Sequence, residues 1–301
     1  MKSIVDRLNE KTPVLLDGAM GTELFRRGVE TRLPSWSAHA LLHQPELVQR
    51  VHEDYIRAGA EILTTNTFRT SFRSLNQAGL GHQSKAMTDL AVQLAKQARE
   101  ESALTGSVWI AGSVAPLEDC YEPQRMPDSS TTLREHAEMI DRLCNAGVDL
   151  LLIETMNSIE EAALAAECAA ATGIPFFVSW VCGSDGNILN GESIALGVRT
   201  LQQYHPSAFL VNCTPTIHLS TALSILIESV DGIPAGAYGN IGKPEPVFGW
   251  EFTNEIDPDS YFHFARSWIA SGARIVGGCC GTTPDHIHAL AKLRGEDDFR
   301  F

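Results

Sequence analysis

Short, almost uninterrupted hydrophobic runs alternate along this chain with longer amphipathic segments. Most of the runs lack the polar–apolar alternation of a half-exposed strand, so they predict parallel strands that are buried on both faces. The eight runs are 14–17, 62–66, 108–113, 150–154, 176–181, 208–212, 233–237 and 274–278.

The segments between these runs have the periodicity of helices with one apolar face. The clearest are 45–58, 84–101, 131–146, 158–172 and 257–271. Ser158, with Glu161 three residues later, resembles a capping box at the start of one helix. Gly59, Gly147 and Gly272 follow helices at the position where a left-handed C-terminal residue is expected.

Eight strand–helix units predict one TIM-type (β/α)8 barrel that forms a single domain over residues 1–301. The alternative is a doubly wound open sheet, which usually has fewer strands and a glycine-rich phosphate loop after the first strand. The segment 17–21 contains glycine but does not match that motif. Two longer loops, 116–130 and 240–254, would lie at the C-terminal face, where such barrels place their active sites.

Charge and composition limit the kinds of molecule that the protein is expected to bind. The formal net charge of −14 argues against nucleic acid and against an anionic membrane surface. The N-terminal segment lacks the apolar core of a signal peptide, and no apolar run reaches the roughly 18 residues of a membrane span. Seven cysteines without a framework spacing favour free thiols in a reducing compartment. These features together predict a cytoplasmic protein.

Polar side chains come at the ends of the predicted strands, and all would face the same mouth of the barrel. They are Asp17, Asn66, Ser113 and Glu154 at the ends of the first four strands, Cys213 after the sixth, and Cys279 and Cys280 after the eighth. Zn²⁺ takes sulfur ligands in a tetrahedron and in catalytic sites keeps one position open. A substrate thiol in that position would be deprotonated. The three cysteines therefore predict group transfer to sulfur.

Each of these residues could also stabilise the fold instead of binding a metal or a substrate. Adjacent strand residues point to opposite faces, so Cys279 and Cys280 can share a metal only if the glycine-rich backbone turns there. The two could instead be structural or form a vicinal disulfide. Asp17 and Glu154 have no basic neighbour in sequence, and a buried carboxylate needs a cation, which a ligand ammonium would supply. Otherwise Asp17 caps a turn and Glu154 pairs with Arg69 or another cation.

Several motifs together resemble the homocysteine S-methyltransferases. They are Asp17 to Thr22 (DGAMGT), Thr64 to Phe68 (TTNTF), Glu154-Thr155, Asn212-Cys213 and Gly278 to Pro284 (GCCGTTP). The family includes betaine- and S-methylmethionine-dependent enzymes and the homocysteine module of cobalamin-dependent methionine synthase. The resemblance runs in order over nearly the whole chain. It implies a (β/α)8 barrel that binds Zn²⁺ and methylates homocysteine to methionine.

The resemblance also implies residue roles. Cys213, Cys279 and Cys280 match the three catalytic zinc thiolates of the family. The substrate-binding set comprises Asp17 and Glu154 for the amino group of homocysteine, the backbone of Gly18 and Ala19 for its carboxylate, and Asn66 from the TTNTF motif. Asn212 and Asn240 fall where the family has asparagines that support the metal ligands.

The methyl donor is less well defined. Arg69 stands where betaine-using relatives carry a tyrosine, and its charge would repel a quaternary ammonium. A sulfonium donor, S-methylmethionine or S-adenosylmethionine, leaves as a neutral thioether and needs no general acid. Trp36, Phe68, Trp180 and Trp250 are candidates to meet its cationic sulfur. A methylfolate donor would need further modules for which this chain has no room.

Three alternatives remain at this stage. One is an enzyme of the same family that uses betaine, another donor or another thiol acceptor. The second is a zinc- or redox-sensing thiol protein in which Cys279 and Cys280 alternate between metal and disulfide. The third is a barrel aldolase or hydrolase with a structural zinc, which would require a lysine or His/Asp ligands at strand ends. The expected partners are small molecules, and the sequence leaves open whether the barrel is a homo-oligomer.

Overall fold

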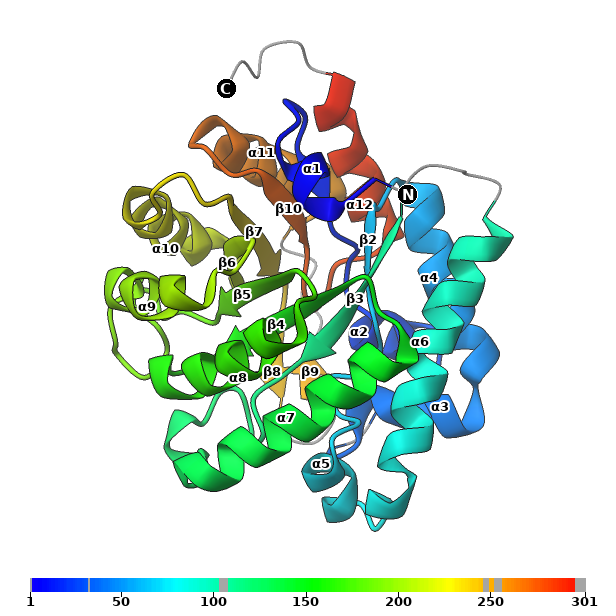
Figure 1. The fold of residues 1–301 in the computed structure, drawn as a ribbon. Helices are drawn as coiled ribbons and strands as arrows, with labels where there is room; N and C mark the ends of the chain where they lie inside the picture. Colours follow the sequence, from blue (N-terminus) through cyan, green and yellow to red (C-terminus); the bar gives the residue numbers. More distant parts are fainter. Residues whose placement is uncertain (1, 32, 103–107, 246–248, 252–255, 296–301) are drawn as a thin grey trace.

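The parallel strands of the chain close into a barrel. A computed structural model describes residues 2–31, 33–102, 108–245, 249–251 and 256–295 (Figure 1). Its main sheet contains β1 (Val14–Leu15), β2 (Ile62–Thr64), β3 (Trp109–Val114), β4 (Leu150–Met156), β5 (Phe176–Trp180), β6 (Ala208–Pro215), β7 (Ala235–Asn240) and β10 (Ile275–Gly278). They pair in the order β1-β10-β7-β6-β5-β4-β3-β2, and a parallel bridge between Leu16 and Ile62 joins the two ends. The predicted TIM-type (β/α)8 barrel is confirmed.

Helices surround the barrel and connect successive strands, as Figure 1 shows. The longer ones are α4 (Pro45–Ala58), α6 (Ser84–Glu101), α7 (Ser129–Ala146), α8 (Ile159–Thr172), α9 (Ile194–Leu201), α10 (Thr216–Ser229), α11 (Pro258–Ala270) and α12 (Pro284–Ala291). Shorter helices are α1 (Ile4–Leu8), α2 (Gly21–Arg26), α3 (His39–His43) and α5 (Phe72–Gln77). A small antiparallel pair, β8 (Lys243–Glu245) and β9 (Gly249–Glu251), follows β7.

Both faces of the strands are buried, which explains their continuous hydrophobicity. In β4, Leu150 and Leu152 belong to the cluster inside the barrel, whereas Leu151 and Ile153 pack in the layer under the helices. Ile4 and Leu8 of α1 join the inner cluster. The strands alternate between two apolar environments instead of between core and water, as a parallel barrel requires.

The helix ends follow the sequence signals, with one difference. Gly59 and Gly147 end α4 and α7 with φ of 107° and 80°. Ser158 caps α8 by accepting a hydrogen bond from the N–H of Glu161 (3.3 Å). The second half of the predicted capping box is wrong, because the Glu161 carboxylate instead accepts the N–H of Leu117 (2.8 Å) in the loop after β3.

In the described part of the chain, no helix is both long and apolar enough to cross a bilayer.

Candidate active site

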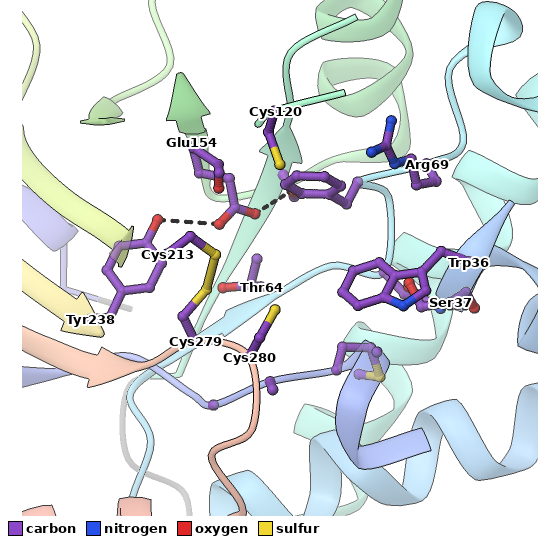
Figure 2. Close-up of a pocket in the computed structure, with 18 of the residues that line it drawn as sticks. Trp36, Ser37, Thr64, Arg69, Cys120, Glu154, Cys213, Tyr238, Cys279 and Cys280 are labelled. Carbon is purple, nitrogen blue, oxygen red and sulfur yellow. Dashed lines mark hydrogen bonds between the residues drawn. A yellow bond between two sulfur atoms is a disulfide. The ribbon is translucent and has the colours of Figure 1, made fainter. Parts of the chain in front are cut away.

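A cavity of about 470 Å³ opens at the C-terminal ends of the strands. This volume falls in the range of roughly 300–1,000 Å³ that small-molecule sites occupy. Its walls come from loops after β1, β2 and β3 and from the ends of β4, β6, β7 and β10 (Figure 2). The polar and sulfur-containing residues that line it are Asp17, Met20, Ser37, Thr64, Thr65, Asn66, Arg69, Ser113, Asp119, Cys120, Tyr121, Glu122, Glu154, Thr155, Cys213, Tyr238, Cys279 and Cys280.

The three predicted cysteines meet in this cavity. The Sγ atoms of Cys213, Cys279 and Cys280 all lie within 4.8 Å of one another. Four ligands in a tetrahedron with Zn–S bonds of about 2.3 Å have sulfurs about 3.8 Å apart, so a cluster of this span could close around one zinc ion. Among the described residues the group offers three sulfurs and no fourth protein ligand, which is the donor set of a catalytic site rather than of a closed structural one.

Two of these cysteines are joined in the structure. Cys213 and Cys279 form a disulfide, and the Cys280 thiol is free. The expectation that all seven thiols are free is therefore wrong for this pair, and the vicinal disulfide between Cys279 and Cys280 does not form. Sulfurs that can bond to each other belong to one cluster, and reduction of the bond yields the three thiols that a zinc site needs.

Local backbone turns bring the sulfurs together. Cys213 lies at a register shift in β6 and has a φ of 47°, a conformation that non-glycine residues seldom adopt. Gly281, with φ of 87°, turns the chain directly after Cys280. A Cβ at Gly281 would collide with the carbonyl of Ile241, whose own N–H donates to the carbonyl of Cys280 (2.8 Å). The predicted turn at the cysteine pair is present, and this position requires glycine.

Asp17 and Glu154 are both buried, with 4% and 7% of their surface exposed. Asp17 accepts two hydrogen bonds from Thr64 of β2, one from its N–H (2.8 Å) and one from its hydroxyl (2.9 Å). Within the described ranges, neither carboxylate forms an ion pair with Lys, Arg or His. Asp17 thus binds the neighbouring strand rather than capping its own turn, and Glu154 does not pair with Arg69.

The pKa values of the two carboxyl groups reflect this burial. Burial raises the pKa of Glu154 to about 7, although its hydrogen bonds from the hydroxyls of Ser113 (2.5 Å) and Tyr238 (3.2 Å) oppose the shift. Burial raises the pKa of Asp17 well above its usual value, against the two bonds from Thr64, and the charge of Glu154 adds to the rise. A cationic ligand between them would restore the ionised forms, so the pair is suited to binding an ammonium group.

The two predicted supporting asparagines differ in what their side chains contact. The side chain of Asn212 accepts from the N–H of Thr155 (3.0 Å) and donates to its hydroxyl (2.7 Å). The side-chain N–H of Asn240 donates to the carbonyl of Cys213 (2.9 Å). Asn212 therefore links the segment of Cys213 to that of Glu154, and Asn240 holds the backbone at Cys213.

The residues predicted to bind the homocysteine carboxylate have different environments. The N–H of Ala19 donates to the Thr282 hydroxyl (3.2 Å), so this donor is already used. The N–H of Gly18 has no hydrogen-bond partner among the described residues. Asn66 donates to the carbonyl of Ser37 (3.0 Å) and accepts from its hydroxyl (2.7 Å). Asn66 thereby positions the Ser37 segment, and its direct contact with substrate stays a prediction.

The aromatic candidates divide into three groups. Trp36 and Phe68 line the cavity and meet edge to face, with ring centroids 6.3 Å apart. The guanidinium carbon of Arg69 lies 5.4 Å from the Phe68 ring centroid. Trp180 is fully buried against Phe209 and does not line the cavity, so this prediction is wrong. The side chain of Trp250 lies outside the described residues.

Sequence reasoning missed some residues of the cavity wall. Tyr238 lies inside β7 and donates to Glu154, but in sequence it is one more aromatic residue in a buried strand. Cys120 and Tyr121 come from the loop after β3, whose length was the available signal. Burial raises the pKa of Cys120 to about 12, so this thiol is neutral at physiological pH.

Comparison with known proteins agrees with this geometry. The model of a family described as homocysteine S-methyltransferase matches residues 14–294. The chain is 33% identical to the homocysteine S-methyltransferase of Escherichia coli K12, covering 94% of this chain and 96% of that one. It is 31% identical to homocysteine S-methyltransferase YbgG of Bacillus subtilis, covering 92% and 93%.

Among solved structures, the chain is similar to the metallated form of the homocysteine methyltransferase MmuM from Escherichia coli. The TM-score is 0.82 at 31% identity, covering 95% of this chain and 98% of MmuM. The oxidised form of MmuM matches with a TM-score of 0.81, covering 94% and 96%. The fold therefore resembles a metallated and an oxidised form of the same enzyme almost equally.

Proposed function

The chain belongs to the homocysteine S-methyltransferase family, and from that premise we propose that it is a zinc-dependent enzyme that methylates homocysteine from a sulfonium donor. Methyl transfer to homocysteine follows from the family, and the zinc and the donor are the proposal. One observation carries it: three cysteine sulfurs lie within 4.8 Å of one another at a cavity that also holds two buried carboxylates, neither of which has a cationic partner among the described residues.

Cys213, Cys279 and Cys280 would hold the zinc once the disulfide is reduced. Zinc bound there would act as a Lewis acid that lowers the pKa of the homocysteine thiol from about 8.5, so that thiolate is available at neutral pH. The protein controls the arrangement of the sulfurs through the left-handed backbone at Cys213, the turn at Gly281 and the bond from Asn240 to the carbonyl of Cys213. A reducing cytoplasm would keep these thiols free, and we place the enzyme there.

Asp17 and Glu154 would bind the ammonium group of homocysteine. Both are buried and lack an ionic partner in the described part of the chain, so an ammonium would relieve the penalty of ionising them. The N–H of Gly18, which has no partner in the described part of the chain, would donate to the carboxylate of the same amino acid. These contacts would orient the thiol toward the cysteine cluster.

The reaction would then be an in-line displacement. The homocysteine sulfur forms a bond to the methyl carbon as the bond from that carbon to the donor sulfur breaks. The electron pair leaves with the donor as a neutral thioether, and the thiol proton passes to solvent, so no general acid is required. Correct alignment of the two substrates can contribute roughly 7–11 kcal/mol to lowering the barrier.

The disulfide between Cys213 and Cys279 favours a second candidate, a thiol switch. A switch needs reversible oxidation but no substrate cavity. It leaves Asp17 and Glu154 without a function, although both are buried in the cavity wall. A methyltransferase whose ligands oxidise when metal is lost accounts for all of these features.

The test is a donor panel on reduced protein of measured zinc content. Homocysteine is supplied with S-methylmethionine, S-adenosylmethionine or betaine, and methionine is quantified. The proposal expects methionine from a sulfonium donor in proportion to bound zinc. Methionine from betaine alone would overturn the donor, and turnover independent of zinc would overturn the metal. Reversible disulfide formation without methyl transfer would favour the switch.

A further inference from the structure

Arg69 is the one Lys, Arg or His among the described residues that line the cavity. The other charged residues of the wall are the carboxylates Asp17, Asp119, Glu122 and Glu154. The methyl transfer described above does not require a cationic side chain. The presence of Arg69 in an otherwise acidic cavity therefore needs an explanation. Its position points to an anionic group on a ligand.

The hydrogen-bonding capacity of Arg69 is mostly unused. One terminal nitrogen donates to the carbonyl of Glu118 (3.3 Å), and the guanidinium carbon lies 5.4 Å from the ring centroid of Phe68. The Nε atom is buried and lacks a partner among the described residues, and no described carboxylate forms an ion pair with this side chain. The two contacts fix the guanidinium in place while leaving donors for a carboxylate, which Arg binds in a bidentate manner.

Asp119 and Arg69 both line the cavity, and the backbone of Glu118 links their segments. Arg69 contacts the carbonyl of Glu118, the residue before Asp119, and both charges act on the thiol of Cys120. One carboxylate oxygen of Asp119 accepts the N–H of Tyr121 (2.9 Å). Like Arg69, Asp119 forms no ion pair in the described ranges. Figure 2 shows Arg69 at the part of the cavity away from the pair Cys213 and Cys279, with Cys120 between Arg69 and Glu154.

We propose that Arg69 and Asp119 form a second site for an amino-acid zwitterion, which receives the carboxylate and the ammonium of the methyl donor. This inference rests on the proposed function and names the donor class: a sulfonium that is itself an α-amino acid, such as S-methylmethionine. Asp17 and Glu154 serve the acceptor, and Arg69 and Asp119 serve the donor. The cavity thus holds two separate pairs of groups for two amino acids.

The test uses three sulfonium ions of matched length. They are S-methylmethionine, the analogue without its carboxylate, (3-aminopropyl)dimethylsulfonium, and the analogue without its ammonium, 4-(dimethylsulfonio)butanoate. Binding to the reduced zinc-loaded protein is measured by calorimetry without homocysteine, so that no turnover is required. The variants are Arg69→Gln, Arg69→Lys and Asp119→Asn, the last of which keeps an acceptor for the N–H of Tyr121.

Arg69→Gln should weaken binding of the two carboxylate-bearing compounds about 10- to 100-fold, as expected for hydrogen bonds to a charged group, and leave (3-aminopropyl)dimethylsulfonium unchanged. Arg69→Lys should recover part of that loss. Asp119→Asn should weaken the two ammonium-bearing compounds and spare the butanoate. Arg125→Gln is the control, because Arg125 is on the loop that carries Asp119, exposed and outside the cavity wall.

Two results would overturn the inference. One is an equal loss for all three compounds in Arg69→Gln, which would mean that Arg69 only supports the loop through Glu118. The other is a higher KM for homocysteine with unchanged donor binding, which would assign Arg69 to the acceptor. Failure of the proposed function is a separate outcome, in which wild-type protein forms no methionine from any donor whatever the calorimetry shows.

Discussion

Asn212 and Thr155 are joined by two hydrogen bonds between neighbouring parts of the barrel mouth. The Asn212 side chain accepts from the backbone N–H of Thr155 (3.0 Å) and donates to its hydroxyl (2.7 Å). Thr155 has a left-handed φ of 58° and follows Glu154, and Asn212 precedes Cys213, whose φ is 47°. Backbone conformations of this kind cost about 1–3 kcal/mol each and persist where surrounding contacts enforce them. One side chain therefore couples the acceptor-binding strand to the cysteine cluster.

Asn212→Ala should weaken both zinc binding and homocysteine binding at the mouth of the barrel. The change leaves buried polar groups of Thr155 unpaired, so we expect the free energy of unfolding to fall by about 1–3 kcal/mol or more. Zinc affinity should fall and the KM for homocysteine should rise in the same variant. Urea unfolding, zinc titration and steady-state kinetics measure the three effects. Asn145→Ala, at an exposed helix position, is the control. Loss of stability alone would show that Asn212 has no role in coupling the strands.

Asp17→Asn tests the acceptor-binding carboxylate. Asparagine keeps an acceptor for one bond from Thr64 but cannot carry charge. The KM for homocysteine should rise about 10- to 100-fold, because a hydrogen bond between charged groups is replaced by a weaker one. Zinc content should be unchanged, since Asp17 is not in the cysteine group. Unaltered homocysteine kinetics would mean that Asp17 was misassigned.

Glu154→Gln tests the raised pKa in the protein without substrate. The folded-state pKa of about 7 exceeds the usual 4.5, so the folded protein binds this proton more tightly than the unfolded chain. The resulting stability is complete below pH 4.5 and is lost as the pH rises through 7. Linkage gives up to about 3 kcal/mol for a shift of this size. Urea unfolding between pH 5 and 8 should show a flatter profile for the variant than for the wild type. Parallel profiles would contradict the assignment.

The pattern of apolar and polar residues was sufficient to predict the barrel, but it predicted only part of the candidate active site. Strands such as β4 are apolar on both faces, and this is a local property that can be read directly. The meeting of Cys213 with Cys279 and Cys280 depends on barrel closure, which the strand count and the family motifs indicated. The hydrogen bond of Tyr238 to Glu154 joins residues 84 positions apart and leaves no local signature. Trp180 was misassigned because an aromatic residue in a strand looks the same whether it faces a cavity or the helix layer.

Glu161 controls the loop after β3 from outside the cavity. Its buried carboxylate accepts the N–H of Leu117 (2.8 Å) and lies 3.1 Å from Nε2 of His136. Glu161→Ala should loosen the loop that carries Asp119, so we expect the KM of the donor to rise several-fold with little change in that of homocysteine. Glu161→Gln, which keeps an acceptor for Leu117, should retain most of the donor affinity. Equal effects on both substrates would indicate general destabilisation instead.

The central claim is that Cys213, Cys279 and Cys280 hold one zinc ion on which turnover depends. The most direct measurement is zinc content and methionine formation in Cys280→Ala under reducing conditions, with Cys168→Ala, a free cysteine of α8, as the control. Loss of a ligand should reduce zinc affinity by more than the roughly 10- to 100-fold that outer contacts contribute. The account predicts a folded Cys280→Ala protein without zinc or activity and an unaffected control. Methionine formation at the wild-type rate by zinc-free Cys280→Ala would contradict it.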